Sequence, residues 1–217
     1  MNKPDITLYL VTNSEDRCEA DFFDIVAQAC ECGVTIVQLR EKNKSGKEFY
    51  ELALRTKAVA DRYGVPLVIN DRVDVALASG AAGVHLGQSD LPVAAARALM
   101  GPGRIVGASA KTVAQAIAAE NAGADYLGVG AIFPTTTKVI TVITPVETLT
   151  EIAKTVKIPV VAIGGLNAGN IGVLYGSGAG GAAVVTAIMD SPDPRAAAAG
   201  LRVLVDANMK CNASALV

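Results

Sequence analysis

The chain has 217 residues, which is enough for one domain with a substantial hydrophobic core. Half of the residues are hydrophobic (51%), 21 are glycine and only 4% are aromatic, a composition that excludes a disordered chain and favours a compact α/β protein. The formal net charge of -2 excludes a general attraction to nucleic acid or anionic membranes, so a cationic site has to be local.

Short apolar runs alternate with amphipathic segments along the whole chain. In chain order, strands are predicted at 6–12, 34–40, 66–71, 83–87, 105–110, 126–131, 159–164 and 181–186. Helical periodicity lies between them, at 21–32, 46–63, 112–122, 145–156 and 193–205. Asp21 and Thr112 are predicted helix N-caps, and the predicted helix ends are Gly33, Gly64 and Gly123.

This alternation predicts a single-domain (βα)8 TIM barrel over residues 1–206. Strictly alternating units require parallel strands with right-handed crossovers, and eight units in about 200 residues fit a small barrel. An open doubly wound sheet is the alternative, but the stretch 13–16 after the first strand is no dinucleotide-type glycine loop. Residues 207–217 lack a periodic apolar face and are expected to form a partly disordered tail.

Polar side chains collect where the predicted strands end. In the stretch 34–42 an apolar run changes to Gln38, Arg40 and Lys42, which alternate along the strand and therefore share one face. Later strands end on Asn70 and Asp71, on Asp90, on Ser109 and on the loop 134–138. Barrel active sites form at the C-terminal ends of the strands, so these residues predict one site for an anionic ligand.

Asp71 and Asp90 end adjacent predicted strands. Each could instead cap the following helix, an alternative that is stronger for Asp90 than for Asp71. Two neighbouring carboxylates repel each other unless a proton or a cation lies between them. Oxygen ligands suit a hard cation, so the pair predicts a Mg²⁺ site completed by phosphate oxygens.

Arg40, Lys42 and Lys138 supply positive charge near these carboxylates. A diphosphate would join the two halves, because Mg²⁺ neutralises part of its charge and the cations take the remaining oxygens. Glu41, Lys42 and Lys44 could also form an ordinary solvated loop, an alternative that fits Lys44 well and Arg40, inside the strand pattern, much less.

A second phosphate position is predicted at the ends of the last strands. The loop 134–138 gathers three threonines, and Gly164 and Gly165 allow close approach of the backbone to a ligand, although Gly164 could simply make a tight turn. His85, the only histidine, lies among apolar neighbours and is predicted to be packed and hydrogen-bonded. No evident general base remains, which favours a reaction with little proton removal.

Several motifs together resemble the thiamine phosphate synthase family. They are Gln38–Lys42, Asn70–Asp71, Gly83–Asp90, Gly107–Ala110, Gly123–Gly130, Pro134–Lys138 and Ala162–Gly165, in order across residues 6 to 205. The resemblance implies a Mg²⁺-dependent transferase that joins 4-amino-2-methyl-5-(diphosphooxymethyl)pyrimidine to a thiazole phosphate. The products would be thiamine phosphate and diphosphate, with the reaction passing through a pyrimidine cation.

The resemblance also implies roles for individual residues. The pyrimidine diphosphate would be held by Gln38, Leu39, Arg40, Glu41, Lys42, Asn70, Ser109 and Lys138, of which Arg40, Lys42, Ser109 and Lys138 are the catalytic candidates. Asp71 and Asp90 would ligate Mg²⁺. The thiazole phosphate would be held by Thr135, Thr136, Thr137, Gly165, Val185 and Thr186.

The sequence departs from the family pattern after Lys138. The family usually continues with polar residues, whereas here the apolar stretch 139–144 follows, and we expect it to form a lid over the reacting cation. Lys111 stands where a histidine is common, and Thr186 where a serine is common.

Three other functions fit the fold class less well. A thiazole tautomerase or regulator-like relative tends to lose the acidic and basic residues that are retained here. A ligand-sensing barrel would need a partner-binding surface, and a phosphosugar isomerase would need a paired acid and base.

The cellular context expected from the sequence is cytoplasmic. The N-terminus lacks a signal-peptide pattern, and the four cysteines include no Cys-x-x-Cys pair, so reduced thiols are expected. The expected partners are the two small-molecule substrates, without nucleic acid or membrane, and a homo-oligomer is left open.

Overall fold

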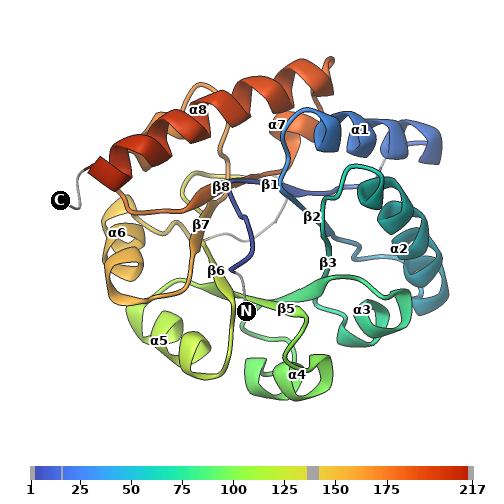
Figure 1. The fold of residues 1–217 in the computed structure, drawn as a ribbon, viewed down its shortest axis with the longest axis horizontal. Coiled ribbons are helices and arrows are strands. Elements are labelled where there is room, and N and C mark those ends of the chain that lie inside the picture. Colours follow the sequence, from blue (N-terminus) through green and yellow to red (C-terminus); the bar gives the residue numbers. More distant parts are fainter. Residues whose placement is uncertain (1–2, 16, 136–141, 215–217) are drawn as a thin grey trace.

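The fold is a closed barrel of eight parallel strands surrounded by helices, seen in a computed structural model that describes residues 3–15, 17–135 and 142–214. Each strand pairs with its sequence neighbours, and β8 closes the barrel on β1 (Figure 1). The strands are β1 Leu8–Val11, β2 Ile36–Leu39, β3 Leu67–Asn70, β4 Gly83–Leu86, β5 Ile105–Ala110, β6 Tyr126–Val129, β7 Val160–Ile163 and β8 Gly181–Val184. The predicted (βα)8 fold class and all eight strands are confirmed.

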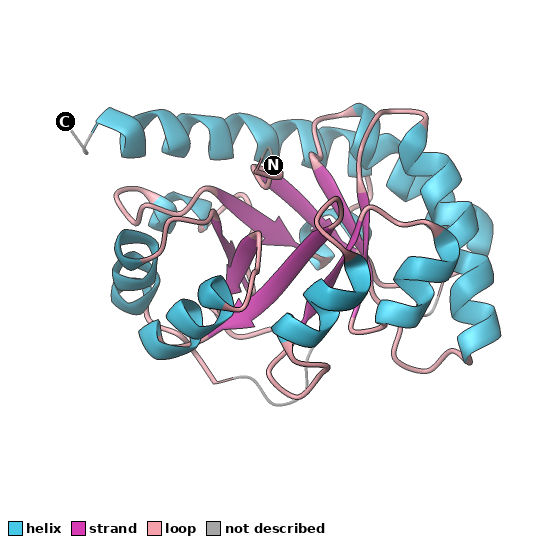
Figure 2. Ribbon diagram, turned by 60° about the horizontal axis from the view of Figure 1, so that its bottom comes forward, coloured by secondary structure: helices cyan, strands magenta, loops and turns pink. Residues whose placement is uncertain are grey.

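The helices lie outside the strands, as Figures 1 and 2 show. They are α1 Glu19–Glu31, α2 Gly46–Asp61, α3 Val73–Ser79, α4 Val93–Met100, α5 Val113–Asn121, α6 Val146–Thr155, the 3-10 helix η1 Ile171–Leu174, α7 Thr186–Met189 and α8 Pro194–Ser214. Within the described residues, no helix is both long enough and apolar enough to cross a membrane.

Alternation along the strands separates two hydrophobic cores. In β1, Leu8 and Leu10 pack outward against the helices, whereas Tyr9 and Val11 point into the barrel. This is the period of two that a strand imposes on its side chains, and it recurs in the other strands. The residues that fill the barrel interior are Ile6, Tyr9, Val11, Ile36, Val68, Tyr126, Val161 and Ala183.

Helix ends follow the predicted signals in part. Thr112 caps α5 by accepting a hydrogen bond from the Gln115 backbone, and Gly33 takes the left-handed φ of 116° directly after the end of α1. The prediction for Asp21 is wrong, because Cys18 is the N-cap of α1 and its sulfur accepts a hydrogen bond from the Asp21 backbone.

The C-terminal helix α8 extends beyond the predicted boundary at 206. Its backbone is helical through Ser214, and the Asn208 side chain donates to the Leu204 carbonyl at 2.7 Å. Alanine and methionine are good helix formers, so the segment stays helical although it has no periodic apolar face. Only residues 215–217 of the predicted tail lie outside the described residues.

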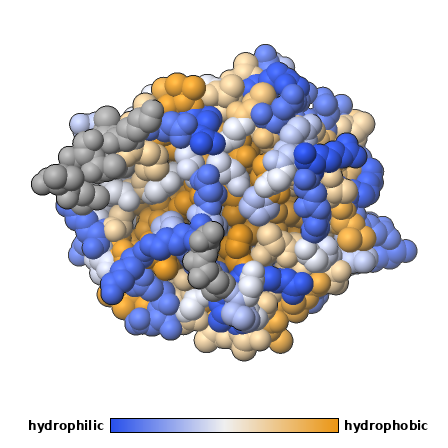
Figure 3. Space-filling view, in the orientation of Figure 1, coloured by the Kyte–Doolittle hydropathy of each residue, from blue (hydrophilic) through white to orange (hydrophobic). Residues whose placement is uncertain are grey.

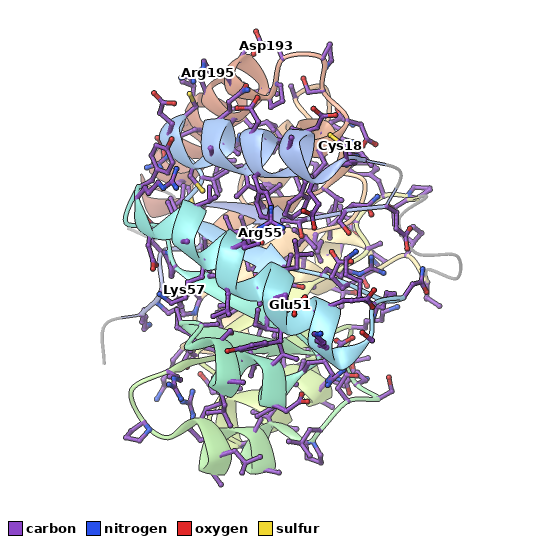
Figure 4. The ribbon with its side chains drawn as sticks, turned by 90° about the vertical axis from the view of Figure 1, so that its right-hand side faces the viewer. Cys18, Glu51, Arg55, Lys57, Asp193 and Arg195 are labelled. Carbon is purple, nitrogen blue, oxygen red and sulfur yellow. The ribbon has the colours of Figure 1, made fainter. Side chains whose placement is uncertain are left out.

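The surface carries ion pairs between neighbouring helices. On one flank, α1 and α2 lie side by side, and Arg55 of α2 lies between them (Figure 4). Its guanidinium contacts Glu19 at 2.5 Å and lies 4.4 Å from the centre of the Phe23 ring. On the face shown in Figure 3, hydrophilic residues surround a more apolar middle.

Candidate active site

A cavity of about 200 Å³ opens at the C-terminal ends of the strands. Its inner wall is apolar and consists of side chains from the barrel interior, among them Val11, Val161 and Ala183. Polar residues from the strand ends form the remainder: Gln38, Arg40, Asn70, Ser109, Lys111, Thr135 and Thr186. The predicted concentration of polar groups at this end of the barrel is therefore confirmed.

Strand β2 sends alternate residues into this cavity. Gln38 is 4% exposed and lines the cavity together with Arg40, as their shared face predicted. Leu39 lies between them and packs in the outer core against the helices. Its side chain therefore cannot contact a ligand in the cavity, contrary to what the resemblance implied for Leu39.

The side chain of Glu41 also points away from the cavity. It is 5% exposed, accepts a hydrogen bond from the Ser14 hydroxyl at 2.8 Å and lies 4.0 Å from the Lys44 ammonium group. Burial raises the pKa of Glu41 above its usual range. Its second carboxylate oxygen is buried and finds no hydrogen-bond partner among the described residues. Glu41 therefore supports the loop after β1 instead of contacting a ligand through its side chain.

Asp71 and Asp90 lie next to each other at the ends of β3 and β4. Burial raises the pKa of Asp90, and a hydrogen bond with Asp71 and the negative charge of Asp71 raise it further. The Asp90 carboxylate also accepts a hydrogen bond from the Gly87 backbone at 2.7 Å, and Lys42 contacts Asp71 at 2.5 Å. Asp71, Asp90 and Lys42 therefore lie close together, as predicted.

Neither aspartate caps a helix. Arg72 and Pro92 are the N-caps of α3 and α4, and neither makes a capping hydrogen bond through its side chain. Asp71 has a φ of 64°, the only left-handed value among the described non-glycine residues, and its backbone N–H donates to the His85 carbonyl at 2.8 Å. An unfavourable backbone conformation held in place beside the cavity is typical of a functional position.

The donor set of this pair fits a magnesium ion that also binds phosphate. Among the residues that the structure describes, no group of three or more His, Cys, Asp or Glu side chains could hold a metal ion. Two adjacent carboxylates are nevertheless typical of Mg²⁺ sites, because this ion keeps several waters and takes its other ligands from substrate phosphates. Repulsion between the two acids also favours a cation between them.

A chain of hydrogen bonds crosses the barrel interior below the cavity. Gln38 donates to the Tyr9 hydroxyl at 2.7 Å, and the hydroxyls of Tyr9 and Tyr126 lie 2.7 Å apart. The Tyr126 hydroxyl lies 2.9 Å from His85 Nδ1, and His85 Nε2 lies 3.0 Å from the Ser109 hydroxyl. This confirms a packed and hydrogen-bonded role for His85, whose pKa burial lowers to about 4.

Sequence reasoning missed both tyrosines. Tyr9 alternates with the other inward residues of β1, which is a usable signal, but Tyr126 begins β6 with nothing local to mark its role. They meet only because the closed barrel brings β1 and β6 across from each other. Lys111 also lines the cavity, although the sequence assigned no function to it.

The other end of the cavity contains the predicted phosphate-binding residues. Thr135, Gly165, Val185 and Thr186 line it together. Gly165 has a φ of 62°, and a Cβ atom there would lie 2.6 Å from the Pro134 carbonyl oxygen, so only glycine fits this close approach. Thr136, Thr137 and Lys138 lie outside the described residues, as do residues 139–141, the first half of the predicted lid. Its described part includes Val142 and Ile143, which are exposed.

Comparisons with known proteins agree on one family. The family model for thiamine monophosphate synthase matches residues 8–188. A thiamine-phosphate synthase of Lacticaseibacillus paracasei is 53% identical over 89% of this chain and 91% of its own length. One of Enterococcus faecalis is 55% identical over 85% of this chain and 87% of its own length.

Solved structures give the same result. A thiamine phosphate pyrophosphorylase from Pyrococcus furiosus has a TM-score of 0.86 and 38% identity, covering 95% of this chain and 98% of its own. A 3-hexulose-6-phosphate synthase is 19% identical with a TM-score of 0.69, which shows a shared fold alone.

Proposed function

The chain belongs to the thiamine monophosphate synthase family, and from this premise we propose how its cavity forms thiamine phosphate. The enzyme is a transferase of thiamine biosynthesis that acts on small-molecule substrates. In the proposed reaction, a pyrimidine diphosphate loses diphosphate and its benzylic-type carbon bonds to the nitrogen of a thiazole phosphate.

The leaving diphosphate lies at the mouth of the cavity. Arg40, Lys42 and Lys138 bind its oxygens, and Asp71 and Asp90 would hold Mg²⁺. When bound, Mg²⁺ would supply positive charge to the leaving group. Lys42 supports this arrangement, because its ammonium group lies 2.5 Å from Asp71 in the free protein and can turn to a phosphate oxygen when substrate binds.

The pyrimidine ring lies against the apolar inner wall, with Gln38, Asn70 and Ser109 around it. Val11, Val161 and Ala183 exclude water from this part of the cavity, which favours coupling of the pyrimidine cation over its hydrolysis. The thiazole phosphate lies at the other end, where Thr135, Thr136, Thr137, Gly165, Val185 and Thr186 bind its phosphate.

The reaction needs no general base. The attacking thiazole nitrogen becomes a quaternary centre and has no proton to lose. This fits a cavity whose one histidine is buried, with its pKa lowered to about 4 and both ring nitrogens engaged in hydrogen bonds. Departure of the diphosphate and the orientation of the two rings are then the main demands on the protein.

The observation that carries this proposal is the adjacent Asp71 and Asp90 pair with Lys42 in contact, while Arg40 and Asn70, their close neighbours in the sequence, line the cavity. The test is to incubate the protein with both heterocyclic phosphates, with and without Mg²⁺, and to measure thiamine phosphate. We expect product only with the metal. Equal product without any divalent ion would contradict the metal site, and binding without turnover would favour a ligand sensor.

We also propose a cytoplasmic location, and the choice between a monomer and a homo-oligomer is left to measurement. Free thiols at Cys18, Cys30 and Cys32 support the location, because a reducing compartment keeps cysteines unpaired. Sedimentation of the purified protein measures the assembly directly.

A further inference from the structure

The hydrogen bonds below the cavity form a series from Gln38 to Ser109, and Gln38 determines in which direction the hydrogens are donated along it. The Gln38 amide nitrogen can only donate, and it donates to the Tyr9 oxygen at 2.7 Å. The Tyr9 and Tyr126 hydroxyls lie 2.7 Å apart and either could donate. Since the Tyr9 oxygen already accepts from Gln38, both groups are satisfied when Tyr9 donates its one hydrogen to the Tyr126 oxygen. Tyr126 in turn donates to His85 Nδ1 at 2.9 Å.

The direction continues through the imidazole to Ser109. A histidine whose Nδ1 accepts a hydrogen bond is neutral and carries its hydrogen on Nε2. His85 Nε2 therefore donates to the Ser109 oxygen at 3.0 Å. Since the Ser109 oxygen accepts from His85, its own hydrogen points elsewhere, and Ser109 lines the cavity.

Packing holds the rings of this chain in place. Tyr9, Tyr126 and His85 are at most 8% exposed. A Cβ atom on Gly107 would lie 2.2 Å from the Tyr126 ring, and one on Gly128 would lie 3.1 Å from His85 Cε1. Glycine at both positions lets the rings lie directly against the backbone, which leaves them little room to turn.

We propose that Tyr9, Tyr126 and His85 are positioning residues that fix the Ser109 hydroxyl as a hydrogen-bond donor into the cavity. The group that Ser109 contacts must then be an acceptor. The identity of that acceptor rests on the proposed function: it is a ring nitrogen or a diphosphate oxygen of the pyrimidine substrate. In the opposite direction, Ser109 would donate to His85 and could only accept from the ligand.

Removing the Tyr126 hydroxyl should reverse the direction of the hydrogen bond between His85 and Ser109. In Tyr126→Phe, His85 Nδ1 loses the hydroxyl that donates to it. The tautomer with its hydrogen on Nδ1 then no longer forfeits a hydrogen bond. Ser109 can then donate to His85 Nε2, and its hydrogen is withdrawn from the ligand. Phenylalanine keeps the shape of the ring, so the packing against Gly107 is retained.

The tautomer can be measured without any ligand. His85 is the only histidine, so the untagged protein labelled with ¹⁵N-histidine gives one pair of ring nitrogen signals. At pH 7 we expect an unprotonated Nδ1 and a protonated Nε2 in the wild-type protein, and a shift toward protonated Nδ1 in Tyr126→Phe. A wild-type protein protonated on Nδ1, or on both nitrogens, would overturn the proposal.

Coupling between Tyr126 and Ser109 can be measured by calorimetry with the pyrimidine diphosphate and Mg²⁺. We expect Ser109→Ala and Tyr126→Phe each to raise the dissociation constant about tenfold, as loss of one hydrogen bond does. The double variant should bind no more weakly than Ser109→Ala alone. Tyr175→Phe, at an exposed position, is the control and should change neither the affinity nor the histidine signals.

Additive losses in the double variant would show a merely structural role for Tyr126 and would overturn the proposal. Tyr9→Phe gives a second series should Tyr126→Phe fold poorly. If the wild-type protein does not bind the pyrimidine diphosphate, the proposed function fails, whereas the tautomer measurement still decides the direction of the chain.

Discussion

Lys42 connects the acidic and basic halves of the proposed diphosphate site. Its ammonium group lies 2.5 Å from Asp71, and its side chain is still 47% exposed. In the free protein it neutralises an acid that the proposed metal would also need. With substrate present, the same group would be free to bind diphosphate, because the carboxylates would then hold the metal.

Replacing this cation should therefore have opposite effects on the two ligands. In Lys42→Met we expect weaker binding of the pyrimidine diphosphate, by about tenfold or more, since a charge-assisted hydrogen bond is lost. Binding of Mg²⁺ alone should not weaken, because a competitor for Asp71 is removed. Calorimetry with each ligand measures both, and Lys44→Met, at a neighbouring loop residue, is the control. A loss of metal affinity in Lys42→Met would contradict this role.

Lys138 is expected to act on the leaving group more than on the second substrate. We predict that Lys138→Ala lowers turnover far more than it weakens binding of the thiazole phosphate, because the charge that it stabilises develops only as diphosphate departs. Single-turnover rates and equilibrium binding separate the two effects. Lys154→Ala on exposed α6 is the matched control, and equal losses in rate and binding would refute this division of roles.

His85 should make the free energy of unfolding depend on pH. Its pKa is lowered by burial from 6.5 to about 4, so between these values the unfolded chain binds a proton that the folded protein does not. Stability is then lost as the pH falls, by roughly 1–2 kcal/mol between about pH 6.5 and 5. Urea unfolding at several pH values measures this slope. His85→Gln should remove most of it, and an equal slope in that variant would contradict the prediction.

Site residues close together in sequence were easier to predict than those brought together by the barrel. Gln38 and Arg40 share one face of a single strand, so alternation alone places both in the cavity. Leu39 and Glu41 belong to the same motif as these ligand-binding candidates. Their side chains nevertheless point away from the cavity, that of Leu39 into the outer core and that of Glu41 toward Ser14. The hydrogen bond between Tyr9 and Tyr126 joins residues 117 positions apart, which no local pattern reveals.

At the scale of elements, β5 depends on a glycine that leaves room for a neighbouring ring. A Cβ atom on Gly107 would lie 2.2 Å from Cζ of Tyr126, a separation that forces the ring or the strand to move. We expect Gly107→Ala to destabilise the fold by about 1–3 kcal/mol, the usual cost of overpacking. Thermal unfolding measures this, and Gly103→Ala, where a Cβ atom meets nothing within 4 Å, should cost far less.

The two helices α3 and α4, which were not predicted from the sequence, lack side-chain caps at their N-termini. Helices α3 and α4 are short, and their N-caps, Arg72 and Pro92, make no side-chain capping bonds, so neither a long period nor a cap residue marks them. The strands were easier to predict because their apolar runs are buried on both sides. Seven of them are nevertheless shorter than predicted, whereas β5 has the predicted bounds, Ile105–Ala110.

At the scale of the whole molecule, the closed barrel gathers groups from distant parts of the chain. Arg40 after β2, Asp71 after β3, Asp90 after β4 and Ser109 in β5 come from four successive units; Arg40 and Ser109 line the cavity, and Asp71 and Asp90 contact each other. Closure also places apolar side chains in the wall of the cavity. The proposed phosphate site would therefore adjoin an apolar surface, as the proposed reaction through a carbon cation requires.

The most direct measurement is a crystal structure with Mg²⁺ and an unreactive analogue of the pyrimidine diphosphate. We predict one Mg²⁺ ion bound by oxygens of Asp71, Asp90 and the diphosphate, with Arg40 and Lys42 on the remaining phosphate oxygens. A diphosphate bound away from these acids, or a metal ion that contacts neither aspartate, would contradict the account.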